Sequence, residues 1–303
     1  MLSKDINSAA TAALEVIETA GFADYALLDS GHGRKLERFG PIVVDRPEPQ
    51  ALWTPGQPER VWRGANAVFS GDDEEDKGRW RIDKPVPESW PVQVGAATML
   101  CRLASFRHLG LFPEQMPHWQ WMLERIAEKR DEPARVLNLF AYTGAASLIA
   151  AAAGAQVTHV DASKKAIAWA KENQTASGLG AASIRWILDD AAKFVAREVR
   201  RGKTYDIILV DPPKFGRGPE GEVWELFASL PPLMKNCAAL LAPEASLVLT
   251  VYAIRASALA FDQLCRDVLK ERGGRFCSGE LAIREAAGVR AVPTSLFTRW
   301  SAQ

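Results

Sequence analysis

Residues 135–161 constrain the fold more than any other segment, because they combine two strands, a glycine turn and an acid in one short unit. The first strand is predicted from Val136 to Phe140, and the turn lies at Gly144. An alanine-rich helix follows, and a second strand ends on Asp161. In α/β sheets, a carboxylate at the tip of the second strand, about 20 residues after the turn, binds the ribose hydroxyls of an adenosine cofactor. The unit therefore predicts an adenosine-binding edge of a parallel sheet.

The turn restricts which adenosine cofactor fits. Dinucleotide sites carry Gly-x-Gly-x-x-Gly, which lets the backbone approach a pyrophosphate. This turn has one glycine, in Asn138-x-Phe140-x-Tyr142-Thr143-Gly144, and the chain has no P-loop motif. S-adenosylmethionine suits such a narrow turn, because it has no phosphates and ends in an amino-acid tail. The alternative is an ordinary strand–helix–strand unit in which Asp161 only caps the next helix.

A second motif makes that alternative the weaker one. Asp211-Pro212-Pro213-Lys214-Phe215 directly follows a buried strand predicted at residues 206–210. Ligands of open α/β sheets bind at the carboxyl ends of the strands. Asp211 is therefore expected beside the cofactor, where a methyl acceptor would meet it.

Composition excludes several classes of protein. The chain has 303 residues, enough for one large or two modest domains, and no apolar run of membrane-spanning length. Residues 8–20 form a short amphipathic stretch with Glu15 and Glu18, which predicts a surface helix rather than a targeting peptide. None of the four cysteines forms a CxxC pair, so no metal site is expected, and a reduced, cytoplasmic protein fits best.

The charge is unevenly distributed. Residues 1–104 hold 12 lysines and arginines against 16 acids, a net charge of −4, and residues 105–303 hold 25 against 21, a net charge of +4. A carboxyl-terminal part with this charge tolerates a polyanion without requiring one. Candidate phosphate contacts are Arg34, Lys35 and Arg38 near a hairpin turn, and a basic cluster at residues 197–203, for which a solvated helix end is the preferred interpretation.

The pattern of strands and helices predicts two domains. Residues 1–104 are β-rich: a hairpin is expected with its turn at residues 30–33, tryptophans follow in short strands, mostly as core residues, and residues 72–76 form an acidic loop. From residue 105 to 303 strands and helices alternate, which predicts a parallel sheet with helices on both faces. The last two strands are joined near Gly288 and should pair antiparallel. Strands are expected near 135–140, 156–161, 183–188, 205–210, 245–252, 274–283 and 291–300, and helices near 114–130, 144–154, 163–177, 190–202, 221–241 and 256–272.

The motifs together resemble those of a known family. Their order is similar to that of class I S-adenosylmethionine-dependent methyltransferases, with a Rossmann-like seven-stranded sheet whose last strand is antiparallel. The most similar branch methylates large-subunit ribosomal RNA at cytosine C5 or guanine N7. The resemblance covers residues 105–303, and residues 109–115 resemble the segment that lies over the cofactor in that branch. No PUA-type RNA-binding module is recognisable. The motifs that carry the resemblance are Asn138-x-Phe140-x-Tyr142-Thr143-Gly144, Asp161-Ala162-Ser163, Asp189-Asp190 and Asp211-Pro212-Pro213-Lys214-Phe215.

The resemblance implies a role for each motif. The turn from Asn138 to Gly144 would shape the pocket for the methionine part, Asp161 with Ala162 would hold the ribose, and Asp189 with Asp190 would face the adenine. Phe112 and Gln115 would close the site from above. Asp189 and Asp190 have a simpler alternative, since acids before a helix are common caps. Asp211 and Pro212 would meet the acceptor.

The chemistry of transfer depends on two positions. In nitrogen methyltransferases an Asp or Asn, two prolines and an aromatic residue orient a planar amino group, but here Lys214 precedes the aromatic Phe215. Lys214 could instead contact a phosphate or the acceptor. Methylation at cytosine C5 needs a cysteine nucleophile, and Ala253 stands where that branch has it. The sequence thus favours methylation of a nitrogen, on RNA, without a covalent intermediate. A small-molecule or protein methyltransferase, or a silent cofactor-binding module, stays open.

Overall fold

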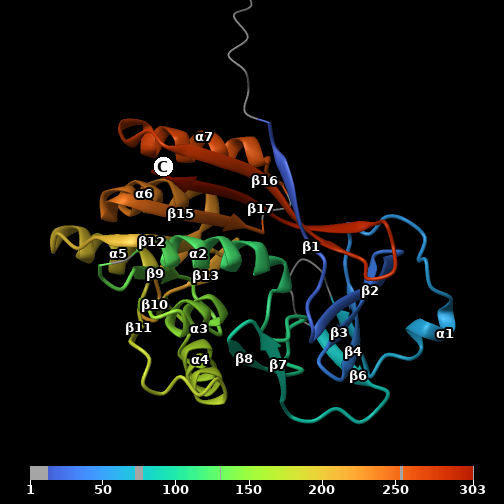
Figure 1. Cartoon of the computed structure of the whole chain (residues 1–303). Helices are drawn as coiled ribbons and strands as arrows, with labels where there is room; N and C mark the ends of the chain where they lie inside the picture. The colour runs from blue at the N-terminus through green and yellow to red at the C-terminus, as the bar shows by residue number, and fades with distance from the viewer. Residues whose placement is uncertain (1–12, 72–77, 130, 253–254, 303) are drawn as a thin grey trace, which may run out of the picture.

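The protein is an α/β fold in which one large sheet carries helices on both faces (Figure 1). The structure is a computed structural model and describes residues 13–71, 78–129, 131–252 and 255–302. None of the helices in these ranges is long and apolar enough to cross a membrane. The predicted acidic loop at 72–76 and Ala253 lie outside the described residues.

The large sheet has eight strands in the order β1-β16-β17-β15-β12-β9-β10-β11. All neighbouring pairs are parallel except those that β17 makes with β15 and β16. The predicted alternation and the antiparallel last strand are therefore confirmed. The strands are β1 (Glu15–Thr19), β9 (Arg135–Leu139), β10 (Gln156–Asp161), β11 (Ile184–Leu188), β12 (Tyr205–Val210), β15 (Leu241–Val251), β16 (Arg275–Arg284) and β17 (Ala291–Ser301).

Two clusters of buried hydrophobic residues join helices to the large sheet. One core cluster joins α2 and α3 to the sheet, and a second joins α5, α6 and α7 to its other face. β12, buried along its whole length between the two layers, is the apolar run expected of a central parallel strand. The helices are α2 (Met116–Glu128), α3 (Ala145–Ala152), α4 (Lys164–Ala176), α5 (Ala191–Arg200), α6 (Leu226–Leu240) and α7 (Ala258–Leu269), with 3₁₀ turns η1 (Pro113–Gln115) and η2 (Lys270–Arg272).

The predicted helix at residues 8–20 is wrong where the structure describes it. Residues 15–19 form β1, which pairs in parallel with β16 and adds an eighth strand at the edge of the large sheet. The β-branched residues Val16, Ile17 and Thr19 favour a strand, and the partner strand lies about 260 residues away in the sequence. Residues 1–12 are outside the described residues.

The region after the Asp211 motif also differs from the expectation. A helix is predicted over 221–241, but it begins only at Leu226. The preceding residues form a small hairpin of β13 (Phe215–Arg217) and β14 (Val223–Glu225), which turns at Gly221 with a φ of 93°. That left-handed conformation suits glycine. The hairpin places Phe215 on the surface, directly beyond Asp211 and its two prolines.

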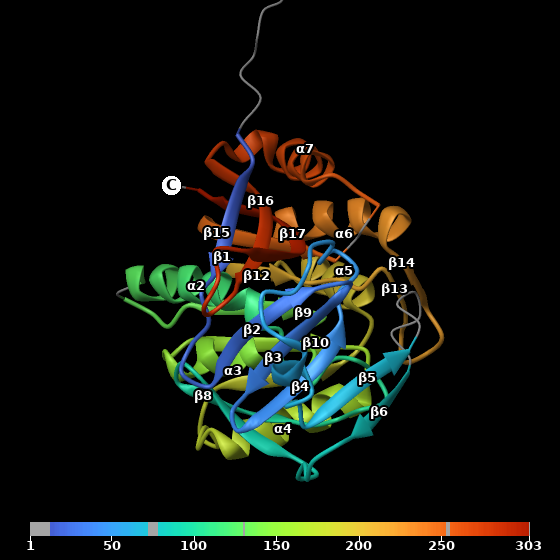
Figure 2. The same ribbon diagram turned by 90° about the vertical axis from the view of Figure 1, so that its right-hand side faces the viewer.

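The amino-terminal region contains a five-stranded sheet, which Figure 2 shows in blue and cyan. The predicted hairpin is confirmed, with its turn at His32 and Gly33. The indole N–H groups of Trp53, Trp62, Trp80 and Trp90 all donate to protein oxygens, as expected of core residues. The elements are β2 (Tyr25–Gly31), β3 (Arg34–Phe39), β4 (Ile42–Pro47), α1 (Glu59–Trp62), β5 (Ala67–Gly71) and β6 (Gly78–Ile82), followed by the hairpin of β7 (Trp90–Val94) and β8 (Ala97–Cys101).

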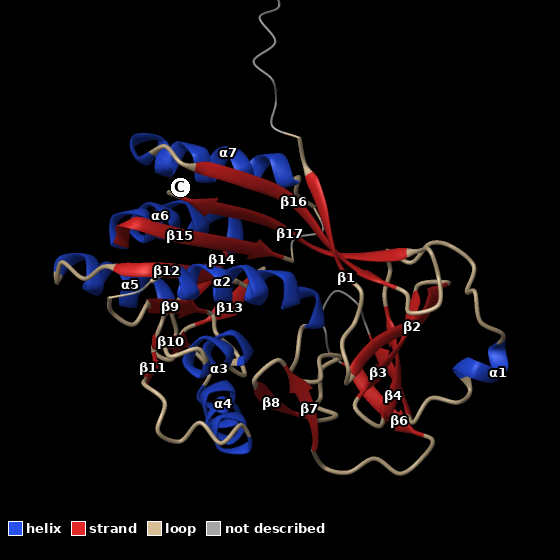
Figure 3. Ribbon diagram, viewed as in Figure 1, coloured by secondary structure: helices blue, strands red, loops and turns tan. Residues whose placement is uncertain are grey.

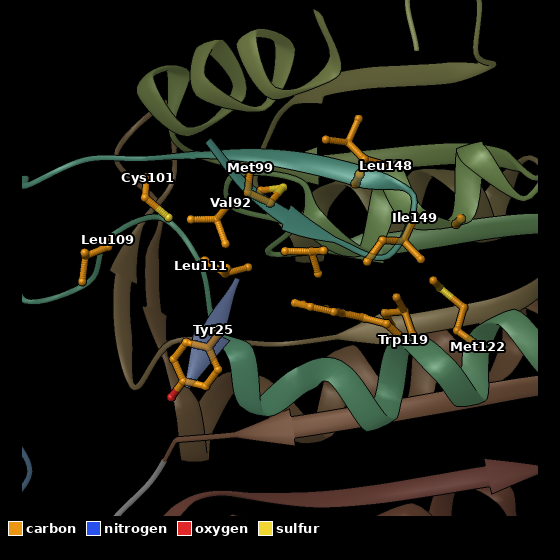
Figure 4. Packing of buried hydrophobic residues seen from close by; sticks show 14 of the residues in the cluster. Tyr25, Val92, Met99, Cys101, Leu109, Leu111, Trp119, Met122, Leu148 and Ile149 are labelled. Carbon is orange, nitrogen blue, oxygen red and sulfur yellow. The ribbon is translucent and has the colours of Figure 1, made fainter. Parts of the chain in front are cut away.

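The β16–β17 hairpin reaches from the large sheet to the amino-terminal sheet (Figure 3). Near its tip Arg290 binds Glu285 and the buried Asp29, and Ser30 donates to Glu285. One hydrophobic cluster runs through both regions and includes Tyr25, Val92, Met99, Trp119 and Leu148 (Figure 4). A division into domains at residue 104 stays a prediction, and β1, the hairpin tip and this cluster all cross it.

Candidate functional site

A hollow of about 570 Å³, part of it open to solvent, lies at the carboxyl ends of β9, β12 and β15. We call it the first hollow. Eight residues that the sequence singles out line it, although they come from three separate segments. They are Phe112, Gln115, Asn138, Phe140, Tyr142, Thr143, Gly144 and Asp211.

The turn after β9 has an unusual backbone. Phe140 and Tyr142 have φ angles of 56° and 48°, and Gly144, at the start of α3, has a φ of 88°. Side chains larger than glycine rarely adopt positive φ, and such residues are concentrated at functional sites. A Cβ at Gly144 would lie 3.1 Å from the Cβ of Ala170, so a larger residue there would crowd α4 and would also have to adopt the positive φ. The backbone of this turn is therefore in a less stable conformation than usual, and this conformation shapes the wall of the hollow.

Asp161 lies at the end of β10, one hydrogen bond away from the first hollow. Its Oδ2 accepts from the backbone N–H of Tyr142 at 2.8 Å, and its Oδ1 accepts from that of Ser163 at 2.7 Å. Burial raises the pKa of this carboxyl, and the two backbone hydrogen bonds oppose the shift. A carboxylate accepts about four hydrogen bonds, so both oxygens keep capacity for a ligand.

The segment before α2 covers the first hollow. Thr143 donates from Oγ1 to the carbonyl oxygen of Gly110 at 2.6 Å, which ties this segment to the turn. The ring of Phe112 packs between those of Tyr142 and Tyr252, with centroid distances of 5.7 and 5.5 Å. The segment is thus held over the turn by a hydrogen bond and by aromatic contacts.

Asp211 extends from the end of β12 into the first hollow. Its Oδ2 accepts from Gln115 Nε2 at 3.0 Å, and the same amide nitrogen donates to the Tyr252 hydroxyl at 3.2 Å. Its Oδ1 is buried and has no hydrogen-bond partner among the described residues. Burial, with the nearby Glu114 carboxyl, raises the pKa of Asp211 to about 8, and the Gln115 hydrogen bond opposes the rise. One carboxyl oxygen of Asp211 is therefore held by the protein, and the other has no hydrogen-bond partner among the described residues.

The remaining predicted residues lie outside the first hollow. Asp190 caps α5, because its side chain accepts from the backbone N–H of Lys193 at 2.9 Å. Asp189 pairs with Arg197, and its backbone N–H donates to the carbonyl of Asp161. Ala162 follows Asp161 directly, and Pro212 is buried. Lys214 and Phe215 are exposed on the surface beyond Asp211.

Comparison with known proteins identifies the family. Residues 73–274 match the model of an S-adenosylmethionine-dependent methyltransferase. The crystal structure of the SAM-dependent methyltransferase from Agrobacterium tumefaciens is 53% identical, with a TM-score of 0.91, and the match covers 95% of this chain and 94% of that one.

The chain belongs to the S-adenosylmethionine-dependent methyltransferases.

A more distant solved structure has the same fold, and a curated sequence relative matches part of the chain. A putative methyltransferase complexed with SAH is 18% identical with a TM-score of 0.72, over 91% of this chain and 75% of that chain. The ribosomal RNA large subunit methyltransferase K/L of Shewanella baltica is 34% identical over 143 residues, 47% of this chain. The chain spans about a fifth of the length of that curated relative, since the match covers 19% of it.

Sequence reasoning missed three residues in and around the first hollow. Thr250 lines the first hollow and donates to Gln115 Oε1 at 3.4 Å. Tyr252 binds the amide of the same residue, and Glu114 is buried nearby. Thr250 and Tyr252 are at the carboxyl end of a predicted central strand, which is a signal for ligand contact. Glu114 gave no such signal, because its partners come from distant parts of the chain.

The four thiols of this methyltransferase are buried or partly buried. Cys101, Cys237 and Cys265 are buried, and burial raises the pKa of each to about 12. Burial also raises the pKa of the partly buried Cys277 to about 11. The predicted core position of Cys237 in α6 is confirmed. Among the described residues no cluster of His, Cys, Asp or Glu could hold a metal ion.

Proposed function

We propose that this methyltransferase transfers a methyl group to a nitrogen atom of RNA without forming a covalent bond to the acceptor. The observation that carries the proposal is Asp211, which lines the first hollow and whose buried Oδ1 has no hydrogen-bond partner among the described residues. A buried polar atom without a partner is costly, so a ligand that donates a hydrogen bond would stabilise the site. The amino group of a nucleobase is such a donor.

The residues of the first hollow fit S-adenosylmethionine, which supplies a methyl group on a positively charged sulfur. We assign the ribose hydroxyls to Asp161, whose two oxygens keep acceptor capacity. The open turn from Asn138 through Phe140, Tyr142 and Thr143 would hold the methionine part. The first amides of α3 after Gly144 would bind its carboxylate, as helix N-termini bind anions.

Two further assignments complete the cofactor site. The adenine would lie beside Ala162, Asp189 and Asp190, and the cap that Asp190 makes through Oδ1 leaves its Oδ2 for the amino group. Phe112 and Gln115 would lie over the sulfur end, where they already line the hollow.

Asp211 would act by positioning the acceptor. Gln115 holds Oδ2, and the prolines at 212 and 213 limit the backbone that follows. The ionised carboxylate would accept a hydrogen bond from the acceptor amino group through Oδ1, so that the nitrogen lone pair points along the line of attack. Correct orientation of two reactants removes a large part of a reaction barrier. Lys214 and Phe215, exposed just beyond, would contact the phosphate and the base of the same RNA.

A covalent route has no support among the described residues. The nucleophile in such a route is a thiolate, and the pKa of every thiol in the chain is raised to about 11 or 12 by burial. Cys237 and Cys265 lie in the core between the sheet and its helices. Positioning by Asp211 is therefore the chemistry that this site favours.

RNA is favoured as substrate by the relatives. Curated relatives of this chain are named ribosomal RNA large subunit methyltransferases. Exposed Lys214, Phe215 and Arg217 next to the site would suit a polyanion with stackable bases. The candidate cations of the amino-terminal hairpin are engaged within the protein: Arg34 with Asp45, Lys35 with Glu48, and Arg38 with two carbonyls. We propose a cytoplasmic location, where reduced cysteines and ribosomal RNA occur together.

The test is methyl transfer from labelled cofactor to total RNA, protein and small-molecule fractions of a strain that lacks the gene. We expect label in RNA from the deletion strain and little in RNA from its parent, where the site is already methylated. Digestion to nucleosides and mass spectrometry should then identify an N-methylated base. Label only in protein or small molecules contradicts the RNA assignment, and label at cytosine C5 contradicts the nitrogen assignment. Cofactor binding with no label in any fraction indicates a silent module.

A further inference from the structure

His118 lines the first hollow, although no motif in the sequence singles it out. It lies in the first turn of α2 and is only 2% exposed. Its Nδ1 accepts a hydrogen bond from Arg299 Nε at 2.9 Å, and its Nε2 is buried with no hydrogen-bond partner among the described residues. Buried polar atoms in folded proteins are nearly always hydrogen-bonded. His118 therefore has hydrogen-bonding capacity that the described part of the protein does not use.

The contact with Arg299 determines which ring nitrogen of His118 carries the hydrogen. A guanidinium group only donates hydrogen bonds, so His118 Nδ1 must hold a lone pair. Burial and the charge of Arg299 lower the pKa of His118 well below its usual value, so the ring is neutral at pH 7. A neutral imidazole has one N–H, which here is at Nε2. The unused atom of His118 is therefore a hydrogen-bond donor.

Arg299 places a positive charge directly behind His118. It lies on β17, with its guanidinium 5.5 Å from the ring centroid of Trp121, and burial lowers its pKa to about 10, so it stays charged at pH 7. Its Nη2 is buried without a hydrogen-bond partner among the described residues. Glu15 and Glu124 act on it through charge, but neither forms a hydrogen bond with it in the part of the chain that the structure describes. A buried cation without a bonded counter-ion is costly, so an anion in the hollow would stabilise this pair.

The start of α3 supplies further donors to the same hollow. Ala145 and Ala146 line it, and the first N–H groups of a helix have no partner within the helix. Helix N-termini bind anions for this reason. α2 and α3 belong to one hydrophobic cluster on the same face of the sheet. S-adenosylmethionine has one anionic group to offer these donors, which is the carboxylate of its methionine part.

We propose that His118 binds the methionine carboxylate of the cofactor through its Nε2–H, together with the first amides of α3, and that Arg299 positions the imidazole and offsets the charge of the carboxylate. This assignment rests on the proposed placement of the methionine part in the first hollow. It adds a side-chain donor and a cation to a subsite that otherwise has backbone donors alone. Recognition of the tail does not involve the methyl acceptor, so its test is independent of the RNA substrate.

The test compares two ligands on the full chain by isothermal calorimetry. S-adenosylhomocysteine carries the amino-acid tail, whereas 5′-methylthioadenosine lacks it and keeps the adenosine and the sulfur. The wild type should bind S-adenosylhomocysteine more tightly. One hydrogen bond to a charged group changes affinity by roughly 10- to 100-fold. His118→Leu should therefore weaken binding of S-adenosylhomocysteine by such a factor and leave binding of 5′-methylthioadenosine unchanged.

Three more variants separate ligand binding from a structural role. His118→Gln keeps an acceptor for Arg299 and an N–H donor on one side chain, so it should retain most of the preference for S-adenosylhomocysteine. Arg299→Met removes the group that positions the imidazole and should reduce the preference without weakening binding of 5′-methylthioadenosine. Arg266→Met is the matched control, because Arg266 also lies over an aromatic ring, that of Phe276 at 4.5 Å, but does not line the first hollow. It should leave the preference unchanged.

Three results would overturn the proposal. A wild-type preference in His118→Leu shows that other groups hold the tail. Equal losses for both ligands in His118→Leu and in Arg299→Met assign the pair a structural role alone. Equal affinity of the wild type for the two ligands contradicts the placement of the tail in the hollow as well. Absence of RNA methylation, with the preference present in the wild type and lost in His118→Leu, contradicts the proposed RNA substrate and supports the role of His118.

Discussion

The backbone N–H of Tyr142 donates to Asp161 Oδ2 at 2.8 Å, and this contact joins the turn after β9 to the tip of β10. Tyr142 adopts a positive φ of 48°, which brings its N–H toward the carboxylate while its side chain lines the first hollow. The acid that is expected to hold the ribose therefore also holds the strained turn. If Asp161 holds the ribose as we propose, cofactor binding and local backbone geometry are coupled through this one carboxylate.

Replacement of Asp161 tests the assignment. Asp161→Asn should weaken binding of S-adenosylmethionine by roughly 1–3 kcal/mol, because a charged hydrogen-bond acceptor is lost. Isothermal calorimetry measures the change, and Asp267→Asn, an exposed carboxylate on α7, is the matched control. NAD should not compete in either protein. Wild-type affinity in Asp161→Asn would remove the ribose assignment.

Asp211 should matter more for transfer than for cofactor binding. Asp211→Asn keeps the size of the side chain but removes the carboxylate that orients the acceptor. We expect kcat to fall roughly 100-fold with little change in cofactor affinity, the pattern of an interaction made in the transition state. Rates on RNA from the deletion strain and calorimetry on the same preparation give both values. Equal losses in kcat and in cofactor affinity would instead assign Asp211 to the cofactor.

The raised pKa of Asp211 predicts how stability depends on pH. Burial and Glu114 raise the pKa of this carboxyl from 3.8 to about 8. The folded state thus keeps a proton that the unfolded state releases above about pH 4. Its contribution to stability is fully present below the unfolded pKa and is lost as pH rises toward 8. Asp211→Asn should therefore raise the melting temperature relative to wild type, and more at pH 8 than at pH 5.

Activity should follow the opposite trend. The orienting role requires the ionised carboxylate, so kcat/KM should rise with pH up to about the pKa of 8. Rates measured from pH 6 to 9 give this rise in kcat/KM. Gln115→Leu removes the hydrogen bond that lowers the pKa of Asp211, so the rise in kcat/KM should occur at higher pH in this variant. A profile that is flat from pH 6 to 9 would contradict a titrating Asp211.

Much of the site was predictable from the sequence. Parallel strands place their carboxyl ends at one edge, so Phe140, Asp161 and Asp211, which end or follow predicted strands, had to lie near one another. The apolar run of β12 and the alternation of strands and helices predicted the parallel sheet, and therefore where this edge lies. This part of the site could be predicted from local sequence patterns alone, because the position of each residue is set by the strand that it ends or follows.

Long-range pairing accounts for what the sequence did not reveal. β1 looked like a surface helix because its partner β16 lies far along the chain. Tyr252 became a site residue only through Gln115, which is 137 positions away. Asp190 is the opposite case, because a local signal was sufficient there. An acid directly before a helix predicts a helix cap, and Asp190 caps α5. Sequence patterns locate strand ends well, whereas contacts between distant loops depend on the complete fold.

Methyl transfer should not depend on any thiol. Cys277 is the least buried of the four cysteines, so Cys277→Ser is the variant that tests this with least disturbance of the core. We expect unchanged kcat on RNA from the deletion strain. Incubation with 5-fluorocytosine-substituted RNA should leave no denaturation-resistant adduct on a gel, and a stable adduct would show that the transfer is covalent.

Lys214 should act on RNA through charge and not on the chemical step. The indole N–H of Trp224 donates to the carbonyl oxygen of Pro213 at 2.7 Å, and the backbone N–H of Leu226 donates to the carbonyl oxygen of Lys214 at 3.1 Å. These two hydrogen bonds anchor the loop beside Asp211, while the lysine side chain is exposed. If its ammonium neutralises one phosphate, Lys214→Ala should raise KM for RNA and leave kcat nearly unchanged.

The dependence on salt separates this role from a structural one. Loss of one contact to a single-stranded phosphate should reduce the slope of log affinity against log salt by about 0.7. Lys235→Ala, an exposed lysine on α6, removes the same charge away from the site and should leave the slope unchanged. Binding measured from 50 to 300 mM salt gives the slopes of all three proteins. Equal slopes in wild type and Lys214→Ala would exclude the phosphate contact, and a fall in kcat at constant KM would instead place the lysine against the acceptor.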